Sequence, residues 1–302
     1  MSEVRSLPVP DGLAGDRVDA GLARLLGMSR TKAAELAEQG AVSVDGRSVG
    51  KSDRLPAGGW LIVELPDVRT PKPPEPVPGL RIRYEDPDLV VIDKPAGVAA
   101  HPSPGWEGPT VVGALTAAGV QLARAGAAER EGIVHRLDAG TSGLMIVAKS
   151  DSAYSVLKRA FKERTVTRRY HALVHGHLTT PVGTIDAPIG RRPGAEYRFA
   201  VVTGGREARS HYEVLEAFHG ATLVEVELET GRTHQIRVHM EAIGHPCIGD
   251  PTYAAQVTPG LTRQWLHAAE VGFHHPTTGE WHEERSKYPD DLQHVLDRYA
   301  AE

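Results

Sequence analysis

Hydrophobic positions in the N-terminal part of the chain follow first a helical and then a strand period. Apolar residues within 17–26 recur every three or four positions, which predicts an amphipathic helix. Ser29 can cap a second helix, and Gly40 can end it. The alternation that follows predicts strands at 42–44 and 60–65, the first of which leads into an Asp-Gly hairpin turn. These elements form a small α+β module.

Beyond residue 80, strand patterns outnumber helical ones. The predicted strands are 80–84, 89–92, 144–148, 168–175, 211–217 and 222–228. Helices are expected over 111–128, from Asp151 onward, and from a cap at Thr233 to a stop at Gly244, whereas 186–209 reads as a basic loop. Several strands are joined as hairpins rather than through helical crossovers. We therefore expect a mixed α+β domain on a largely antiparallel sheet, not a doubly wound fold.

A proline-rich stretch separates the two patterns. Residues 67–79 contain five prolines, which is typical of a semi-rigid extended linker. The 302-residue chain has about the length of two domains. We predict a module at 1–66, a linker at 67–79 and a larger domain at 80–302.

Composition narrows the class of protein. Lys and Arg total 34 against 39 Asp and Glu, so the net charge of −5 gives no overall sign of a nucleic-acid binder. One local basic cluster exists: residues 158–169 hold six basic residues against one acid, although a solvated helix face would look the same. Cys247 is the single cysteine, and no stretch resembles a signal peptide or a membrane span. We expect a cytoplasmic protein.

One carboxylate stands on a loop that enters a core strand. Asp138 lies between the apolar pair Ile133–Val134 and the glycine-punctuated residues 139–143, and the apolar run 144–148 follows. Binding and catalytic groups are often held on such loops. On the local sequence alone, however, a turn-capping aspartate is the preferred interpretation.

The spacing of residues does not match the motifs of several other kinds of site. The histidines show no His-Glu-x-x-His pattern, and His274, His275 and His282 beside a turn are expected at the surface. Residues 46–52 lack one spacer of a P-loop, and 140–143 lack one of an esterase elbow. No dinucleotide fingerprint follows a strand. Spacing therefore supports neither a metal site nor a bound dinucleotide. The remaining set of carboxylate, guanidinium, aromatic and basic groups suits covalent catalysis by Asp on a nucleic-acid base.

The N-terminal pattern resembles the alpha-L RNA-binding module of ribosomal small-subunit protein four. The matching stretches are Arg17–Asp19, Ser29–Ala33, Gly40–Gly46 and Lys51–Ser52. In that family the second helix and the following turn present cations to structured RNA. The resemblance implies this role for Arg30, Lys32, Arg47 and Lys51, which could otherwise be ordinary surface cations.

The larger domain resembles the RluA family of pseudouridine synthases, in particular the enzymes that act on large-subunit rRNA. The resemblance rests on successive motifs in register: Asp93–Gly97 with His101–Pro102, His135–Asp138 with Thr141–Gly143, Arg169–Gly176, and Thr230–His239. It implies an isomerase that detaches uracil from its ribose, turns it over and rejoins it through carbon, without a cofactor. One departure is Ala139–Gly140, where the family often has a charged pair.

The resemblance also implies residue roles. Asp138 would be the nucleophile, Tyr170 would stack on the base, and Arg237 would pair with the aspartate. Arg136 would enter the RNA stack where the flipped uridine was. The alternatives are a core aromatic for Tyr170, a helix-surface cation for Arg237, and a partner of Asp138 for Arg136.

RNA is the partner that these motifs imply, bound by what we expect to be a monomer. In the basic cluster we expect the following residues to meet phosphates: Lys158, Arg159, Lys162, Arg168 and Arg169. The rival functions are a synthase that acts on tRNA and, from a different class, a non-catalytic RNA-binding or ribosome-assembly protein.

Overall fold

A computed structural model describes residues 3–28, 30–65, 75–103, 105–125 and 130–301. The chain forms two compact units, Met1–Lys72 and Pro73–Glu302. Most of the predicted linker, and the predicted cap Ser29, lie outside the described residues. Among the helices that the structure describes, none is long and apolar enough to cross a membrane.

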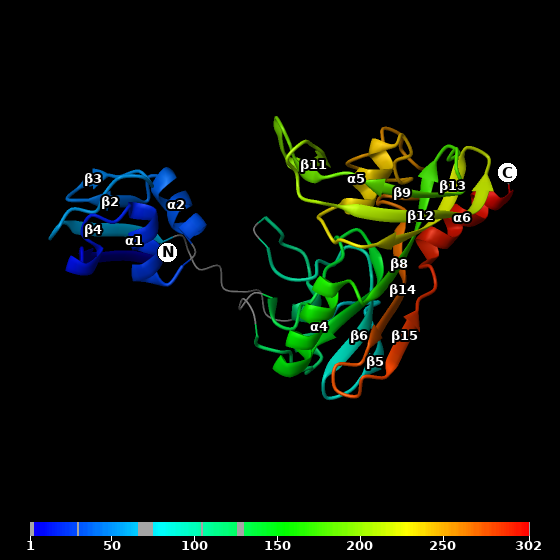
Figure 1. Cartoon of the computed structure of the whole chain (residues 1–302), viewed down its shortest axis with the longest axis horizontal. Coiled ribbons are helices and arrows are strands. Elements are labelled where there is room, and N and C mark those ends of the chain that lie inside the picture. Colours follow the sequence, from blue (N-terminus) through cyan, green and yellow to red (C-terminus); the bar gives the residue numbers. More distant parts are fainter. Residues whose placement is uncertain (1–2, 29, 66–74, 104, 126–129, 302) are drawn as a thin grey trace. The chain divides into compact units, whose positions relative to one another are not determined.

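The first unit packs two helices on a four-stranded sheet of order β1-β4-β2-β3 (Figure 1). Its elements are β1 (Glu3–Pro8), α1 (Val18–Leu26), α2 (Arg30–Glu38), β2 (Val42–Val44), β3 (Arg47–Ser48) and β4 (Trp60–Leu65). The hairpin turn is as predicted: Asp45 and Gly46 both have positive φ, as a type I′ turn requires. Strand β1 was not predicted from the sequence; it pairs antiparallel with β4 along its full length.

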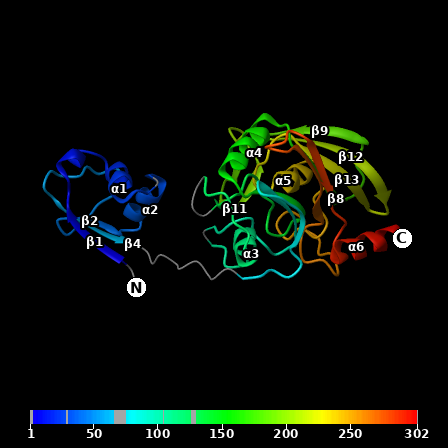
Figure 2. The same cartoon turned by 90° about the horizontal axis from the view of Figure 1, so that it is seen from below.

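The second unit is built on a nine-stranded sheet of order β5-β6-β7-β14-β8-β13-β12-β9, with β15 also paired to β14 (Figures 1 and 2). The strands are β5 (Arg81–Glu85), β6 (Leu89–Lys94), β7 (Ser142–Ala148), β8 (Thr167–His175), β9 (Val182–Asp186), β12 (Arg209–Phe218), β13 (Ala221–Leu228), β14 (Leu266–His274) and β15 (Trp281–Arg285). Of the described pairings, β7 with β14 is parallel and the others are antiparallel. The predicted α+β class with a largely antiparallel sheet is confirmed.

Helices and a hairpin flank this sheet. They are α3 (Val111–Ala117), α4 (Asp151–Glu163), α5 (Gln235–Ala242), α6 (Asp290–Ala301), and the pair β10 (Ile189–Arg192) with β11 (Ala195–Val201). The predicted helix 111–128 was too long, because the chain turns at Gly119 with φ 80°. The predicted loop 186–209 contains the β10–β11 hairpin. Thr233 was the wrong cap: His234 precedes α5, in a left-handed conformation.

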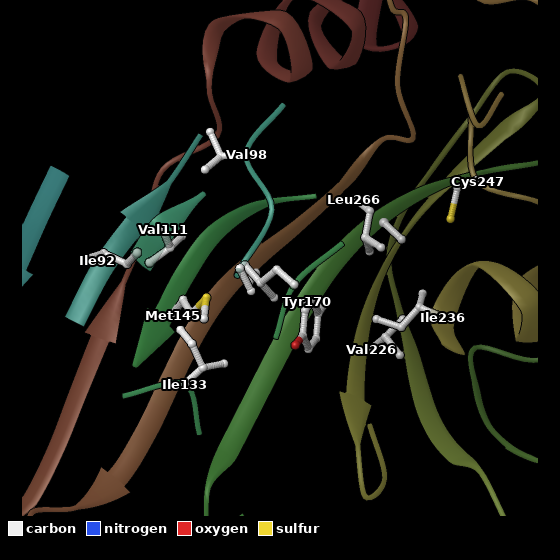
Figure 3. Packing of buried hydrophobic residues seen from close by; sticks show 14 of the residues in the cluster. Ile92, Val98, Val111, Ile133, Met145, Tyr170, Val226, Ile236, Cys247 and Leu266 are labelled. Carbon is white, nitrogen blue, oxygen red and sulfur yellow. The ribbon is translucent and has the colours of Figure 1, made fainter. Parts of the chain in front are cut away.

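Alternate residues of the central strands enter different hydrophobic clusters. Met145 and Val147 of β7 join the main cluster, which also holds Tyr170 and Ile236 (Figure 3). Leu144 and Ile146 of the same strand instead pack with Leu157 of α4 in another cluster. The β7 strand is therefore buried on both faces, as its continuous apolar run predicts. The loop before it has a rigid support.

Candidate active site

The loop that carries Asp138 is held by backbone bonds at both ends. The Gly132 carbonyl accepts from the Ala148 amide, and the Asp138 carbonyl accepts from the Thr141 amide at 3.0 Å. The Ala139 carbonyl, next to the candidate nucleophile, accepts from the Gly97 amide at 2.8 Å. Asp138 thus sits on a fixed turn, and its carboxylate is left for other contacts.

Lys94, at the end of β6, is a fully buried lysine beside this loop. Its Nζ donates to the carbonyls of Pro95, Val98 and Ala139 at 3.0, 2.8 and 3.3 Å. Burial lowers the pKa of Lys94 to about 7, although the Asp138 charge opposes that shift. Three carbonyls match the three donors of an ammonium group, so Lys94 ties the residues after β6 to the Asp138 loop.

Replacing Lys94 with methionine is expected to lower the free energy of unfolding by roughly 2–5 kcal/mol. The apolar chain keeps the volume but leaves three carbonyls without their donor. The half-exposed pair of Lys149 and Glu85 offers a control, and Lys149→Met should cost about 0–1 kcal/mol. Urea unfolding followed by circular dichroism measures both. Equal costs for the two variants would contradict the role of Lys94.

The Asp138 carboxylate faces a clamped arginine. Arg237 Nη1 lies 3.3 Å from Asp138 Oδ2, while Arg237 Nε and Nη2 donate to the two oxygens of Asp250 at 2.6 and 2.8 Å. Asp250 is buried and also accepts from the amides of Thr252 and Tyr253. A bidentate pair fixes the plane of the guanidinium, so one N–H of Arg237 is aimed at Asp138.

The electrostatics keep Arg237 charged. Burial alone would lower its pKa, but the hydrogen bonds that Arg237 donates to Asp250 and the charge of Asp138 raise the pKa overall. Burial likewise opposes ionisation of Asp250, yet Arg237 brings the pKa of that carboxyl below its ordinary value. Arg237 is 5% exposed, so the alternative of a helix-surface cation is wrong.

Tyr170 of β8 belongs both to the core and to the site. Its side chain packs in the main hydrophobic cluster (Figure 3) and is 6% exposed, yet it also lines a cleft of about 980 Å³ together with Asp138. Burial raises the pKa of the Tyr170 hydroxyl, which stays protonated at neutral pH. The core-aromatic interpretation and a place in the cleft are therefore both compatible with the position of Tyr170.

Arg136 lies at the rim of the same cleft. It is exposed, and it lines both the main cleft and a smaller hollow beside Trp106. The described contacts include no ion pair between Arg136 and Asp138. The structure thus brings Asp138, Tyr170 and Arg136 to one cleft, with Arg237 behind the carboxylate.

The residues of the basic cluster lie in different environments, some in the cleft and one outside it. Lys158, Arg159 and Lys162 of α4 line the cleft, and the described ion pairs include none of them. Arg168 also lines it, but is buried: its Nη2 donates to the Leu228 carbonyl, and its guanidinium lies over the Phe161 ring. Arg169 is not part of the cleft lining and pairs with Glu225, Glu227 and Glu270.

Neutralising the two lysines of α4 should weaken RNA binding more than catalysis. Lys158 and Lys162 are four residues apart on one helix, so they share a face. In the double variant Lys158→Gln, Lys162→Gln we expect a higher KM and an unchanged kcat. The slope of log affinity against log salt concentration should become shallower by about 1 for each phosphate that the lysines no longer neutralise. Arg285→Gln is the control, because that exposed cation pairs with Glu270 outside the cleft. The same change in slope for both variants would contradict the prediction.

The candidate RNA-binding cations of the first unit are partly engaged with acids. Arg30 pairs with Asp19 at 3.3 Å, and Lys51 pairs with Glu38. Both pairs are solvent-exposed on the cation side, and such pairs are weak enough to open to a phosphate. Arg47 is exposed on β3 beside the hairpin turn.

At Ala139–Gly140, where the family often has a charged pair, the structure leaves little space for a larger side chain. A Cβ on Gly140 would lie 2.7 Å from Oε1 of Gln264. Gln264 instead donates to Thr141 Oγ1 at 3.0 Å, and Arg263 donates to the Gly140 carbonyl at 3.1 Å. Neighbouring side chains thus occupy the space that a larger residue at 140 would need.

Sequence reasoning missed four residues of the site: Lys94, His234, Asp250 and Tyr253. Lys94 and His234 lie within motifs that were recognised, but nothing in their spacing distinguishes a buried lysine or an inward histidine. Asp250 and Tyr253 follow α5 in an irregular stretch without a periodic pattern. His275, expected at the surface, is buried and bonds Asp86 at 2.6 Å.

Comparisons with known proteins identify the family of each unit of the chain. Residues 88–242 match the family described as RNA pseudouridylate synthase, and residues 16–61 match the S4 domain. An uncharacterised RNA pseudouridine synthase of Mycobacterium bovis is 58% identical over 298 residues, which are 97% of either chain. Ribosomal large subunit pseudouridine synthase D of Nitrosomonas europaea is 43% identical over 302 residues, 96% of this chain and 86% of that one.

A solved structure of a related protein is also similar to this chain. Human RNA pseudouridylate synthase domain containing 1 is 27% identical with a TM-score of 0.58, and the similarity covers 76% of this chain and 98% of that one. The family inferred from the motifs is thereby confirmed. The chain belongs to the RNA pseudouridylate synthase family, and an S4 domain precedes its synthase domain.

Proposed function

We propose that this enzyme converts a specific uridine of large-subunit ribosomal RNA into pseudouridine, with Asp138 as the nucleophile. One observation carries the proposal: the Asp138 carboxylate stands in a cleft lined by cations, against an arginine that Asp250 holds in place. An ion pair of this kind keeps a carboxylate charged when a base covers it.

The other groups take the roles that their positions allow. Tyr170 stacks on the uracil, and its neutral phenol lies close to the reacting carbons. Arg136 fills the gap that the extruded uridine leaves in the RNA, which offsets part of an unstacking cost of a few kcal/mol. The reaction breaks the bond between N1 and the ribose and forms one between C5 and the same ribose carbon. The C5 proton is released and N1 takes up a proton, so the product is an isomer of the substrate.

The choice of ribosomal RNA rests on two supports. The Nitrosomonas europaea relative is named for the large ribosomal subunit, and the S4 domain supplies a second RNA-binding unit. Arg30, Lys32, Arg47 and Lys51 are the cations that we assign to it. The monomeric state and the cytoplasmic location stay predictions.

Mapping pseudouridines in total RNA tests the substrate directly. Cells that lack this protein should lose the modification at one or a few uridines of large-subunit rRNA, and the wild-type gene should restore it. Loss of a pseudouridine at a tRNA position instead would identify tRNA as the substrate. An unchanged map would favour a non-catalytic RNA-binding protein.

A further inference from the structure

His234 occupies an unusual position beside the nucleophile. It precedes α5 with φ 58°, a conformation that costs energy for a residue other than glycine and that often marks functional sites. Its side chain is 22% exposed and lines both the main cleft and the smaller hollow. His234 Nε2 lies 3.9 Å from Asp138 Oδ2, which is too long for a hydrogen bond. One ring nitrogen therefore faces the space beside the carboxylate.

The hydrogen bonds of Tyr253 assign the proton on that ring. In the described part of the chain, the Tyr253 hydroxyl has two hydrogen-bond partners, the Phe199 amide at 3.2 Å and His234 Nδ1 at 3.0 Å. A phenol oxygen can accept two hydrogen bonds, but its single proton has only His234 Nδ1 as an acceptor among the described contacts, which favours donation from the hydroxyl to Nδ1. The neutral imidazole then carries its own proton on Nε2, the nitrogen that faces the site.

The surroundings keep this imidazole neutral. Burial lowers the pKa of His234, although the Asp138 charge opposes the shift, and the nearby guanidiniums of Arg237 and Arg136 lower it further. The Phe199 and Tyr253 rings meet His234 edge-on, with centroids 5.8 and 5.7 Å away. The site therefore presents a fixed, uncharged N–H donor.

We propose that His234 is a catalytic residue whose Nε2–H donates to a carbonyl oxygen of the uracil seated against Asp138. The proposal rests on Asp138 being the nucleophile. If the carboxylate adds to the pyrimidine ring, the electron pair of the opened double bond moves to a carbonyl oxygen. If it displaces uracil from the ribose, the electron pair of the broken bond spreads over the carbonyl oxygens. Either route develops negative charge that a preorganised N–H stabilises.

Sulfur-substituted RNA tests the contact. Transcripts carry 2-thiouridine or 4-thiouridine at the mapped target, because sulfur is a weaker hydrogen-bond acceptor than oxygen. In His234→Ala we expect kcat to fall by about 10²–10³-fold with KM unchanged, and His234→Gln, which keeps a donor, to recover part of the loss. One of the two thio-RNAs should slow the wild type but not His234→Ala. A wild-type rate in His234→Ala, or equal thio-effects in both proteins, would overturn the proposal.

The tautomer has its own test. In ¹⁵N-detected spectra, the His234 signals, identified by their absence in His234→Gln, should show Nε2 protonated and Nδ1 unprotonated. Tyr253→Phe keeps the ring that Arg237 and Arg198 contact but removes the hydroxyl, and it should lower kcat in the wild type more than in His234→Gln. A proton on Nδ1 in the wild type overturns the proposal.

The two proposals fail separately. Activity in Asp138→Asn would remove the nucleophile assignment and this inference with it. An inactive Asp138→Asn beside a fully active His234→Ala would remove the inference alone.

Discussion

Asp138→Asn is expected to lower kcat by at least about 10³-fold while leaving RNA affinity within about twofold. Asparagine keeps the shape of the side chain and can still accept from Arg237 through its oxygen, but it has no nucleophilic carboxylate. The fold should be unaffected, because Arg237 keeps its bidentate partner Asp250. Tritium release from RNA labelled at uracil C5 measures turnover, and filter binding measures affinity.

A matched control separates charge from chemistry. Asp151→Asn removes one negative charge at the start of α4, where the carboxylate accepts from the Ala125 amide away from the cleft lining. Its kcat should equal that of the wild type within about twofold. Residual turnover near the wild-type rate in Asp138→Asn would show that another group is the nucleophile.

Asp250→Ala is expected to damage both stability and catalysis. It leaves the buried Arg237 guanidinium with Asp138 as its remaining carboxylate partner, and breaking a buried pair from one side costs about 3–5 kcal/mol of unfolding free energy. Arg237 also loses the bonds that fix its orientation toward Asp138. Because small misplacements of catalytic groups are costly, we expect kcat to fall by about 10²-fold.

The pair between Arg209 and Asp186 provides the comparison. Asp186 is half-exposed and accepts from two nitrogens of Arg209, so Asp186→Ala should cost about 0–1 kcal/mol and leave kcat unchanged. Chemical unfolding and single-turnover assays at a temperature where both variants are folded test the two effects. An Asp250→Ala protein that is destabilised but fully active would show that catalysis does not require the clamp on Arg237.

The hydrophobic pattern and the family resemblance together predicted the elements around Asp138, the proposed nucleophile. The apolar run of β7 and the amphipathic face of α4 are local signals, because burial follows directly from the spacing of apolar residues. The approach of Arg237 to Asp138, which are 99 positions apart, came from the family motifs and not from periodicity.

The remainder of the site depends on tertiary contacts that have no local signature. A lysine is ordinarily placed at the surface, and Lys94 is buried because three carbonyls from two loops converge on it. The β10–β11 hairpin was not predicted because its segment is rich in arginines and glycines, a composition that is typical of loops. The role of Asp250 depends on Arg237, which lies on the preceding helix, and the role of Tyr253 depends on its hydrogen bond with His234.

The Arg263 side chain links the Asp138 loop to the last helix of the fold. Arg263 donates to the Gly140 carbonyl and pairs with Asp291 at the start of α6. The groups that hold this loop in place therefore extend along the sequence from Lys94 to Asp291. During synthesis on the ribosome, the loop reaches this full set of contacts only after residue 291 has left the exit tunnel, so a nascent chain completes its candidate active site late.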